Sequence, residues 1–249
     1  MSAPHDFGPA ARFALYYAPP RESAWWRAGS AWLGRDAESG ETLLQPAIDE
    51  IDTIDTIGDA GGSLHALTRS PRRYGWHATL VPPFRLAADV TPEALFAAAQ
   101  AWAQDRAAFE ANVEAAMLGR FVALRPADPA SETALRDLAA AALRALGSLR
   151  AVQTAAEIAK RLEAPLTPRQ RAYVAEWGYP YVFDEFRFHM TLSDSLDYPA
   201  LGAHLVNAWN AKMRAAGALP VCGAAIFVEP EPGAPFVLWQ RVPFAKAAA

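Results

Sequence analysis

The sequence predicts a mixed helix and strand fold, built from two similar lobes that pack around a shared cleft. Two observations lead to this prediction. The 249 residues are 52% hydrophobic and 20% charged, a composition typical of a folded chain with a large core. The order strand, helix, strand, turn, strand follows both His77 and His189, which indicates an internal duplication too long for a solenoid repeat.

We expect a single domain over residues 1–249, because no low-complexity linker divides the chain. The two lobes should lie at about 65–125 and 180–245, and a helical segment over 131–178 should separate them. Each lobe would then contribute one histidine-bearing strand to the cleft.

Short apolar runs alternate with helical spacing in the first half of the chain. The run Arg12–Ala18 is apolar and aromatic and is stopped by Pro19 and Pro20, so it predicts a buried strand. Thr91 followed by Pro92 is a typical helix start. The expected elements are a strand at 12–18, a helix at 22–33 ended by Gly34, a strand within 72–84, a helix at 91–109, and strands at 112–118 and 121–124 that meet at Gly119.

The second half repeats these signals. Thr167 and Pro168 start a helix that Gly178 ends, and 181–193 alternates polar and apolar residues as a strand does. The expected elements are helices at 131–149, near 160–163 and at 167–177, a strand at 181–193, a helix at 199–216, and strands at 221–228 and 236–242.

The segment from 41 to 62 has an acidic rhythm, with Asp49, Asp52 and Asp55 spaced three apart. Three such carboxylates could bind a cation, but the spacing is not that of an EF-hand loop. We therefore interpret them as a solvated acidic face.

Composition and charge exclude several classes of function. With 23 basic and 27 acidic side chains the net charge is −4, which offers no broad basic field for nucleic acid.

The single Cys222 cannot form an internal disulfide, and we expect it to be buried. No signal peptide or membrane span is evident, so we expect a soluble cytoplasmic protein. Tryptophans at helical or strand spacing should belong to the core: Trp25, Trp32, Trp76 and Trp102.

One short motif occurs twice, as His77-Ala78-Thr79-Leu80 and as His189-Met190-Thr191-Leu192. Side chains two apart on a strand emerge on the same face, so each His shares a face with its Thr. Extending the alternation adds polar candidates to those faces. The predicted site comprises the catalytic pair His77 and His189, with Thr79, Thr191, Arg187, Arg73 and Ser193 as candidate phosphate-binding residues.

This set of side chains suits a phosphodiester. Hydrolysis needs one group that removes a proton from the nucleophile and another that protonates the leaving oxygen, and two histidines can do both near neutral pH. Hydroxyl groups can donate to the non-bridging oxygens. The scheme needs no metal and no other cofactor.

A two-histidine metal site is the alternative, but a third acidic ligand on the same strand faces is absent. The remaining histidines lack the Thr partner and receive no role: His5, His65 and His204.

At these motifs the sequence resembles the two-histidine (2H) phosphoesterase superfamily, which is named for paired H-x-[ST]-hydrophobic motifs. The segments GSAWLGRD at 29–36, RRYGWHATLVPPFRL at 72–86 and LTPRQRAYVAEWGYPYVFDEFRFHMTL at 166–192 look like its uncharacterised branch associated with phosphonate-utilisation operons. The resemblance implies a bilobal α+β fold of two antiparallel sheets with flanking helices around a central cleft. It assigns catalysis to His77 and His189 and phosphate binding to Thr79 and Thr191.

One position departs from that branch, because Val81 stands where a basic residue is frequent, and nothing is carried over to 41–62. The resemblance implies metal-independent hydrolysis of a small cyclic sugar phosphate or nucleotide, linked to phosphonate metabolism. The competing interpretation is a non-catalytic module that binds a nucleotide or phosphorylated metabolite in the same cleft. The partner is in either case a small molecule.

Overall fold

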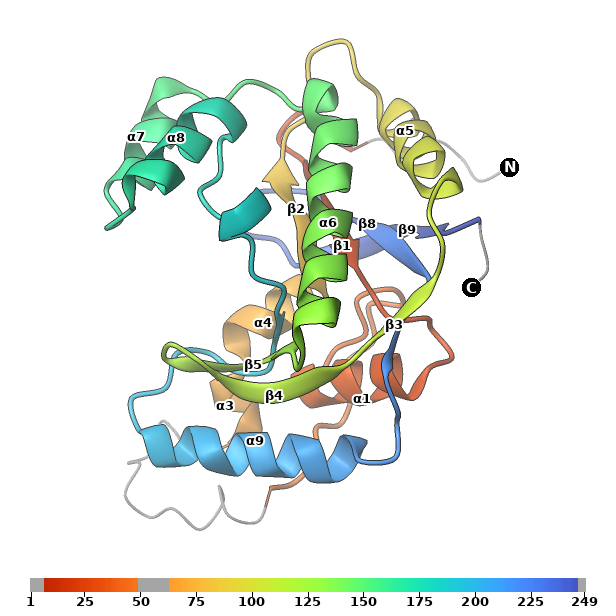
Figure 1. Ribbon diagram of the computed structural model, residues 1–249, viewed down its shortest axis with the longest axis vertical. Coiled ribbons are helices and arrows are strands. Elements are labelled where there is room, and N and C mark those ends of the chain that lie inside the picture. Colours follow the sequence, from red (N-terminus) through yellow and green to blue (C-terminus); the bar gives the residue numbers. More distant parts are fainter. Residues whose placement is uncertain (1–6, 49–62, 246–249) are drawn as a thin grey trace.

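A computed structural model describes residues 7–48 and 63–245 and shows an α+β fold (Figure 1). The strands are β1 (Arg12–Tyr17), β2 (Ala78–Phe84), β3 (Phe109–Ala111), β4 (Val113–Leu118), β5 (Phe121–Pro126), β6 (Met190–Thr191), β7 (Leu219–Val221), β8 (Gly223–Glu229) and β9 (Val237–Pro243). The α-helices are α1 (Ala24–Leu33), α3 (Leu64–Leu67), α4 (Arg69–Tyr74), α5 (Pro92–Gln104), α6 (Pro129–Leu146), α7 (Ala155–Leu162), α8 (Pro168–Trp177) and α9 (Pro199–Met213).

The strands form one large antiparallel sheet, in the order β4-β5-β6-β2-β1-β8-β9, and a two-stranded sheet of β3 and β7. Strand β1 lies in the interior of the large sheet, and its residues from Phe13 to Tyr17 are all buried, as its unbroken apolar run predicts. The predicted antiparallel α+β architecture is therefore confirmed.

The two-lobe prediction required the two motif strands to face each other across a cleft. The structure does not show this arrangement. Strands β2 and β6 are neighbours in the large sheet, and they pair at Ala78 and Met190. That short pairing joins the part formed by β4, β5 and β6 to the part formed by β2, β1, β8 and β9. Figure 1 shows β4 and β5 running across the direction of β2 rather than beside it.

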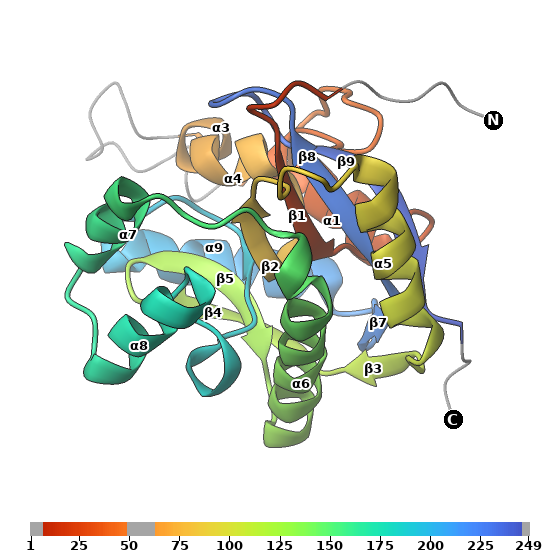
Figure 2. The same ribbon diagram turned by 90° about the horizontal axis from the view of Figure 1, so that it is seen from above.

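Helices cover the sheet on several sides. Helix α6 packs on β2 and on α5, whereas α9 packs on β4 and β5 and also touches α1. Figures 1 and 2 show the paired helices α7 and α8 on one side of α6 and α5 on its other side. Among the described residues, no helix is both long enough and apolar enough to cross a membrane.

Local capping chemistry sets several helix boundaries as predicted. Thr91 caps α5 by accepting from the Ala94 amide, and Thr167 forms a capping box with Gln170 at the start of α8. Gly178 ends α8 in the left-handed conformation. The predicted strands at 112–118 and 121–124 are β4 and β5, joined through Gly119 with a positive φ of 61°.

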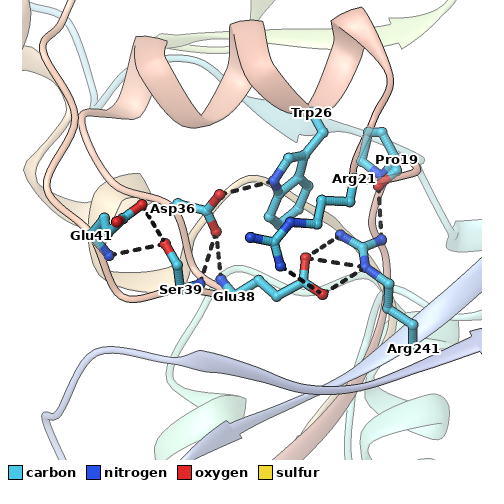
Figure 3. Close-up of polar contacts among 8 residues, drawn as sticks. All are labelled: Pro19, Arg21, Trp26, Asp36, Glu38, Ser39, Glu41 and Arg241. Atoms are coloured by element: carbon cyan, nitrogen blue, oxygen red, sulfur yellow. Dashed lines mark hydrogen bonds and ion pairs between the residues drawn. The ribbon is translucent and has the colours of Figure 1, made fainter.

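A polar network holds the loop after α1 against β9 (Figure 3). The Arg241 guanidinium donates to both carboxylate oxygens of Glu38, over 2.8 to 3.2 Å, and to the Pro19 carbonyl at 2.9 Å. In the same loop, Asp36 accepts a hydrogen bond from the Trp26 indole at 3.1 Å. The network fixes α1 relative to the sheet, and α1 in turn supports both motif segments.

Both motif segments contain less strand than predicted. Arg72 to Tyr74 belong to helix α4, because Gly75, with a φ of 80°, breaks the chain direction before β2 begins. An added Cβ at Gly75 would meet the Cβ of Ala37, so the turn requires glycine. Before the second motif, residues 183–185 form a 3₁₀ turn, and only Met190 and Thr191 are strand.

The core contains the predicted tryptophans, since Trp25, Trp32, Trp76 and Trp102 are all buried. Cys222 was predicted to be buried, and this prediction is wrong, because its side chain is exposed directly before the first residue of β8. The acidic residues Asp49, Asp52 and Asp55, together with His5, lie outside the described residues.

Candidate functional site

The antiparallel pairing of β2 with β6 brings the two motifs together in a crosswise arrangement. Ala78 pairs with Met190, so one step along each strand sets His77 opposite Thr191 and Thr79 opposite His189. A cavity of about 250 Å³ is lined by His77 and Thr191, and a larger one of about 540 Å³ by Thr79 and His189. Phe121 lines both cavities, so they adjoin.

Helix α1 contacts the segments of both motifs. Gly29 lets the indole of Trp76 approach its backbone so closely that any Cβ there would collide with it. Three residues later on the same helix, the Trp32 indole donates to the Leu192 carbonyl at 2.8 Å. Trp76 precedes His77 and Leu192 follows Thr191, so one rigid helix positions both ends of the site.

His77 is held in one orientation by a hydrogen bond and a stacked ring. Its Nδ1 lies 2.8 Å from the Gly75 carbonyl oxygen, and the ring of Tyr16 stacks on the imidazole with 3.8 Å between centroids. Burial lowers the pKa of His77 to about 4, with His189 adding to the effect and the Gly75 hydrogen bond opposing it. The imidazole is therefore neutral at pH 7, with its proton on Nδ1 and a lone pair on Nε2.

His189 uses the same backbone device in different surroundings. The Nδ1 atom of His189 lies 2.9 Å from the carbonyl oxygen of Arg187, two residues earlier in the chain. The Nδ1 atom of His77 makes the corresponding contact with the carbonyl oxygen of Gly75. The ring of His189 meets Phe121 edge-on, with 5.9 Å between centroids. Because a carbonyl oxygen can only accept, Nδ1 carries a hydrogen in both residues, and both Nε2 atoms are left for the cleft.

The two threonines offer hydroxyl groups beside the imidazoles. The Thr79 hydroxyl lies 3.5 Å from Nε2 of His77, at the limit of a hydrogen bond. Thr191 lines the smaller cavity, and in the described part of the chain its hydroxyl has no hydrogen-bond partner. Both hydroxyls can therefore donate to a ligand.

The other three candidates are placed differently from one another. Arg187 is exposed on the larger cavity, and no carboxylate within the described ranges pairs with its guanidinium. Arg73 lines neither histidine cavity, because it lies in α4 and pairs with the buried carboxylate of Glu229. Its predicted place on the His77 face assumed a strand and is wrong for that reason.

Ser193 lines the smaller cavity but is committed to the backbone. Its hydroxyl accepts from the Val122 amide at 2.9 Å and donates to the Asp194 carbonyl at 2.8 Å. Val81, where the resemblance expects a basic residue, is buried. Ser193 therefore joins the second motif to β5, and its contact with a ligand stays a prediction.

Two residues at the site were not among the predicted ones. Asp194 accepts hydrogen bonds from the backbone amides of Arg69 and Ser70, at 2.8 and 3.2 Å, and so binds the start of α4. Tyr16 stacks on His77 from β1. Asp194 lies two residues after the second motif, which is a sequence signal, whereas Tyr16 is one of several aromatic residues in a buried strand and carries none.

Metal-ligating side chains do not gather at this site. Across residues 7–48 and 63–245, no group of three or more His, Cys, Asp or Glu side chains is arranged to hold a metal ion. The chemistry available from the described side chains is that of two imidazoles and two hydroxyls.

The chain is similar to known proteins along most of its length. A family model described as "Protein of unknown function (DUF1045)" matches residues 79–237, which include Thr79, His189 and Thr191. The chain is 39% identical over 239 residues to the ribose 1,5-bisphosphate phosphokinase PhnN of Janthinobacterium sp. (strain Marseille), covering 94% of this chain and 51% of that protein. It is 38% identical over 231 residues to the protein of the same name from Laribacter hongkongensis (strain HLHK9), covering 93% and 51%. The chain thus spans about half the length of the curated relatives it matches.

Proposed function

The chain belongs to the DUF1045 family of proteins of unknown function, and we propose that it is a 2H-type enzyme that hydrolyses a small cyclic phosphodiester without a metal ion. The observation that carries this proposal is the crosswise placement of two histidines and two threonines on adjoining cavities. Both Nε2 atoms are available at the cleft, which is the arrangement that paired acid and base catalysis needs.

We assign the general base to His77 and the general acid to His189. The pKa of His77, lowered to about 4 chiefly by burial, keeps its Nε2 unprotonated at pH 7. In the proposed step a water oxygen bonds to phosphorus while Nε2 of His77 takes the water proton. The bond from phosphorus to the ester oxygen breaks, and Nε2 of His189 donates its proton to that oxygen. The products are a phosphomonoester and a free hydroxyl group.

Thr79 and Thr191 have the role of binding the phosphate. Each stands opposite a histidine on the neighbouring strand, so one hydroxyl lies on either side of a phosphorus atom placed between the imidazoles. Hydrogen bonds to the non-bridging oxygens stabilise the charge that these oxygens carry in the transition state. Arg187, on the rim of the larger cavity, adds a positive charge for the anionic substrate.

The relatives' names narrow the substrate that we propose. Those proteins are named for a kinase that acts on ribose 1,5-bisphosphate. If a 1,2-cyclic phosphate of ribose 5-phosphate is opened by breaking the bond between phosphorus and O2, the product is ribose 1,5-bisphosphate. A cyclic ribosyl phosphate therefore suits both the site and the relatives, and it fits the link to phosphonate metabolism that the resemblance implies.

We do not transfer the relatives' kinase activity to this chain. The sequence contains no GxxxxGK[ST] phosphate-binding loop, and the chain spans about half of the named proteins. Hydrolysis by the histidine pair is the reaction that the described side chains support.

A direct test incubates the purified protein with cyclic ribosyl phosphates and follows the products by phosphorus NMR. We expect a phosphomonoester, formed equally well with and without a chelator. Activity that a chelator abolishes and a divalent ion restores would contradict the proposal in favour of a metallohydrolase. Calorimetric binding of the same compounds without any turnover would favour the non-catalytic binding module.

A further inference from the structure

Tyr16 is a buried tyrosine whose hydroxyl has no hydrogen-bond partner in the described parts of the chain. The residue is 1% exposed and stacks on the imidazole of His77. Its neighbour in β1, Tyr17, is equally buried but donates its hydroxyl to the Pro220 carbonyl at 3.0 Å. Buried hydroxyl groups are nearly always hydrogen-bonded, so the unpaired hydroxyl beside a catalytic candidate calls for an explanation.

Two further tyrosine hydroxyls lie near that of Tyr16. Burial raises the pKa of Tyr16 well above its usual value, and the neighbouring hydroxyls of Tyr74 and Tyr179 raise it further. Tyr74 likewise adds to the raised pKa of Tyr179. The rings of Tyr16 and Tyr74 both lie beside the His77 imidazole, with 3.8 and 6.2 Å between centroids. Within the described residues neither the Tyr74 nor the Tyr179 hydroxyl has a hydrogen-bond partner.

Two of the three tyrosines line the cavities of the site. Tyr74 lines the smaller cavity with His77, and Tyr179 lines the larger one with His189. The polar atoms that are sealed from solvent without a partner, among the described residues, do not include the Tyr16 hydroxyl, so that oxygen keeps some contact with solvent, although Tyr16 lines neither cavity. Tyr74 and Tyr179 thus each line one of the two adjoining cavities, and Tyr16 stacks on His77.

We propose that the hydroxyl groups of Tyr16, Tyr74 and Tyr179 form a subsite for an uncharged, oxygen-rich group of the substrate, such as the hydroxyls of a sugar ring. A phenolic hydroxyl both donates and accepts, which matches the hydroxyl groups of a sugar. This inference rests on the proposed function, since it describes the part of the cyclic diester that does not react.

The two guanidinium groups closest to Tyr16 and Tyr74 are held by one carboxylate and line neither cavity. The guanidinium of Arg12, which lies close enough to influence Tyr16, is paired with Glu229. Arg73, stacked 5.1 Å from the centre of the Tyr74 ring, is paired with the same carboxylate. Arg12 and Arg73 thus share the single negative charge of Glu229 and line neither cavity, whereas Arg161 stacks 5.4 Å from the centre of the Tyr179 ring.

The test compares two cyclic phosphodiesters, ribose 1,2-cyclic phosphate and the hydroxyl-free ethylene phosphate. We expect Tyr74→Phe, Tyr179→Phe and Tyr16→Phe each to lower kcat/KM about five- to tenfold for the ribosyl compound, the effect of one lost hydrogen bond. The same variants should change kcat/KM for ethylene phosphate less than about twofold, because phenylalanine keeps the ring contacts. Tyr198→Phe, an exposed residue that lines neither cavity, is the matched control and should change neither.

An equal loss on both compounds would overturn the inference, because the hydroxyls would then act without a sugar. If the wild type turns over neither compound, the proposed hydrolysis fails and calorimetry decides the subsite alone. Weaker binding of the ribosyl compound by the variants, with ethylene phosphate binding unchanged, would still support the subsite. No binding of the ribosyl compound, or binding that the variants leave unchanged, would overturn it. Tyr74→Phe and Tyr179→Phe, at partly exposed positions, keep the test valid if Tyr16→Phe does not fold.

Discussion

The two histidine segments have nearly the same sequence but very different surroundings. His77 precedes the seven-residue strand β2, follows a tight glycine turn and stacks on Tyr16. His189 precedes β6, which is two residues long, and follows irregular chain and a 3₁₀ turn. The first imidazole is thus built into the middle of the sheet, whereas the second is carried by a short strand bound to β5 and to α1.

This difference assigns different chemistry to identical motifs. The carbonyl two residues before each histidine fixes the same tautomer in both, so the hydrogen-bond pattern does not distinguish them. Burial beside Tyr16 sets His77 apart, because removing an imidazole from water disfavours its charged form and so lowers its pKa. The lowered pKa of His77 thus comes from its packing and not from its motif, and the role of base that we propose for His77 rests on this.

The largest expected effect comes from removing either histidine. We expect His77→Ala and His189→Ala each to lower kcat by about 10²- to 10⁴-fold, because each proton transfer contributes that much. The two variants should differ in their pH profiles, because His77→Ala should lose the acidic limb that follows the lowered pKa of His77, whereas His189→Ala should keep it. Steady-state rates between pH 3.5 and 9 measure both.

Thermal unfolding of the same variants is the necessary control, since a variant that unfolds says nothing about catalysis. If both variants remain folded and lose the same limb of the profile, the assignment of base and acid is wrong.

The next effect is on stability and concerns His77 alone. Its pKa is about 4 in the folded protein and 6.5 when unfolded, so the unfolded chain binds a proton more readily between these values. The associated stability is fully present above pH 6.5 and is lost as the pH falls towards 4. The loss should be about 3 kcal/mol, from about 1.4 kcal/mol per pKa unit. Denaturant unfolding at pH 7.5 and 4.5 measures it.

His77→Gln provides the comparison for that measurement, because it removes this titration and leaves the carboxylates in place. The wild type should lose more stability on acidification than the variant does. Equal losses would show that His77 is not protected from protonation.

A smaller effect is expected where the second motif holds the first. Asp194 binds the amides of Arg69 and Ser70, so Asp194→Ala leaves the start of α4 without these hydrogen bonds. We expect a loss of about 1 to 2 kcal/mol in the free energy of unfolding, the usual effect of removing a helix cap. Asp197→Ala is the matched control, because the Asp197 pair with Arg120 is exposed on both sides, and its loss should stay below about 1 kcal/mol. A similar loss from the two variants would mean that Asp194 does not connect the motifs.

The smallest effect separates the two arginines predicted for the site. Arg187→Gln should raise KM about three- to tenfold with little change in stability, because it removes one charge from the larger cavity. Arg73→Gln should instead lower the melting temperature and leave KM unchanged, because it removes a partner of the buried Glu229. Kinetics and melting curves on both variants decide the matter, and an unchanged KM in Arg187→Gln would exclude that residue from substrate binding.

Much of the local structure was predictable because its causes are local. Thr91 and Thr167 cap their helices with the side chain that the sequence shows, and Gly178 ends α8 where a positive φ is needed. The run from Arg12 to Tyr17 is buried along nearly its whole length, as its apolar character requires. These features depend on residues within one helical turn or one strand.

The errors occurred where distant parts of the chain compete with a local pattern. Arg73 alternates with His77 as a strand residue would, yet it lies in α4. Asp194 binds the start of that helix and Glu229 pairs with the Arg73 guanidinium, both from more than a hundred residues away in the sequence. The alternation over 181–193 also indicated a long strand, but only Met190 and Thr191 find strand neighbours. Cys222 is apolar enough for a core, and only its place beside β8 makes it exposed.

By itself, the sequence determined the mixed fold class and several helix boundaries, such as the starts of α5 and α8, because side-chain periodicity and capping act over a few residues. Only the tertiary structure decided that the two motifs lie crosswise on adjacent strands, which the Ala78 and Met190 pairing specifies. It also decided that Tyr16 covers His77 and that Arg73 turns away to Glu229. These arrangements depend on which distant segments become neighbours, and burial by such neighbours is what lowers the pKa of His77.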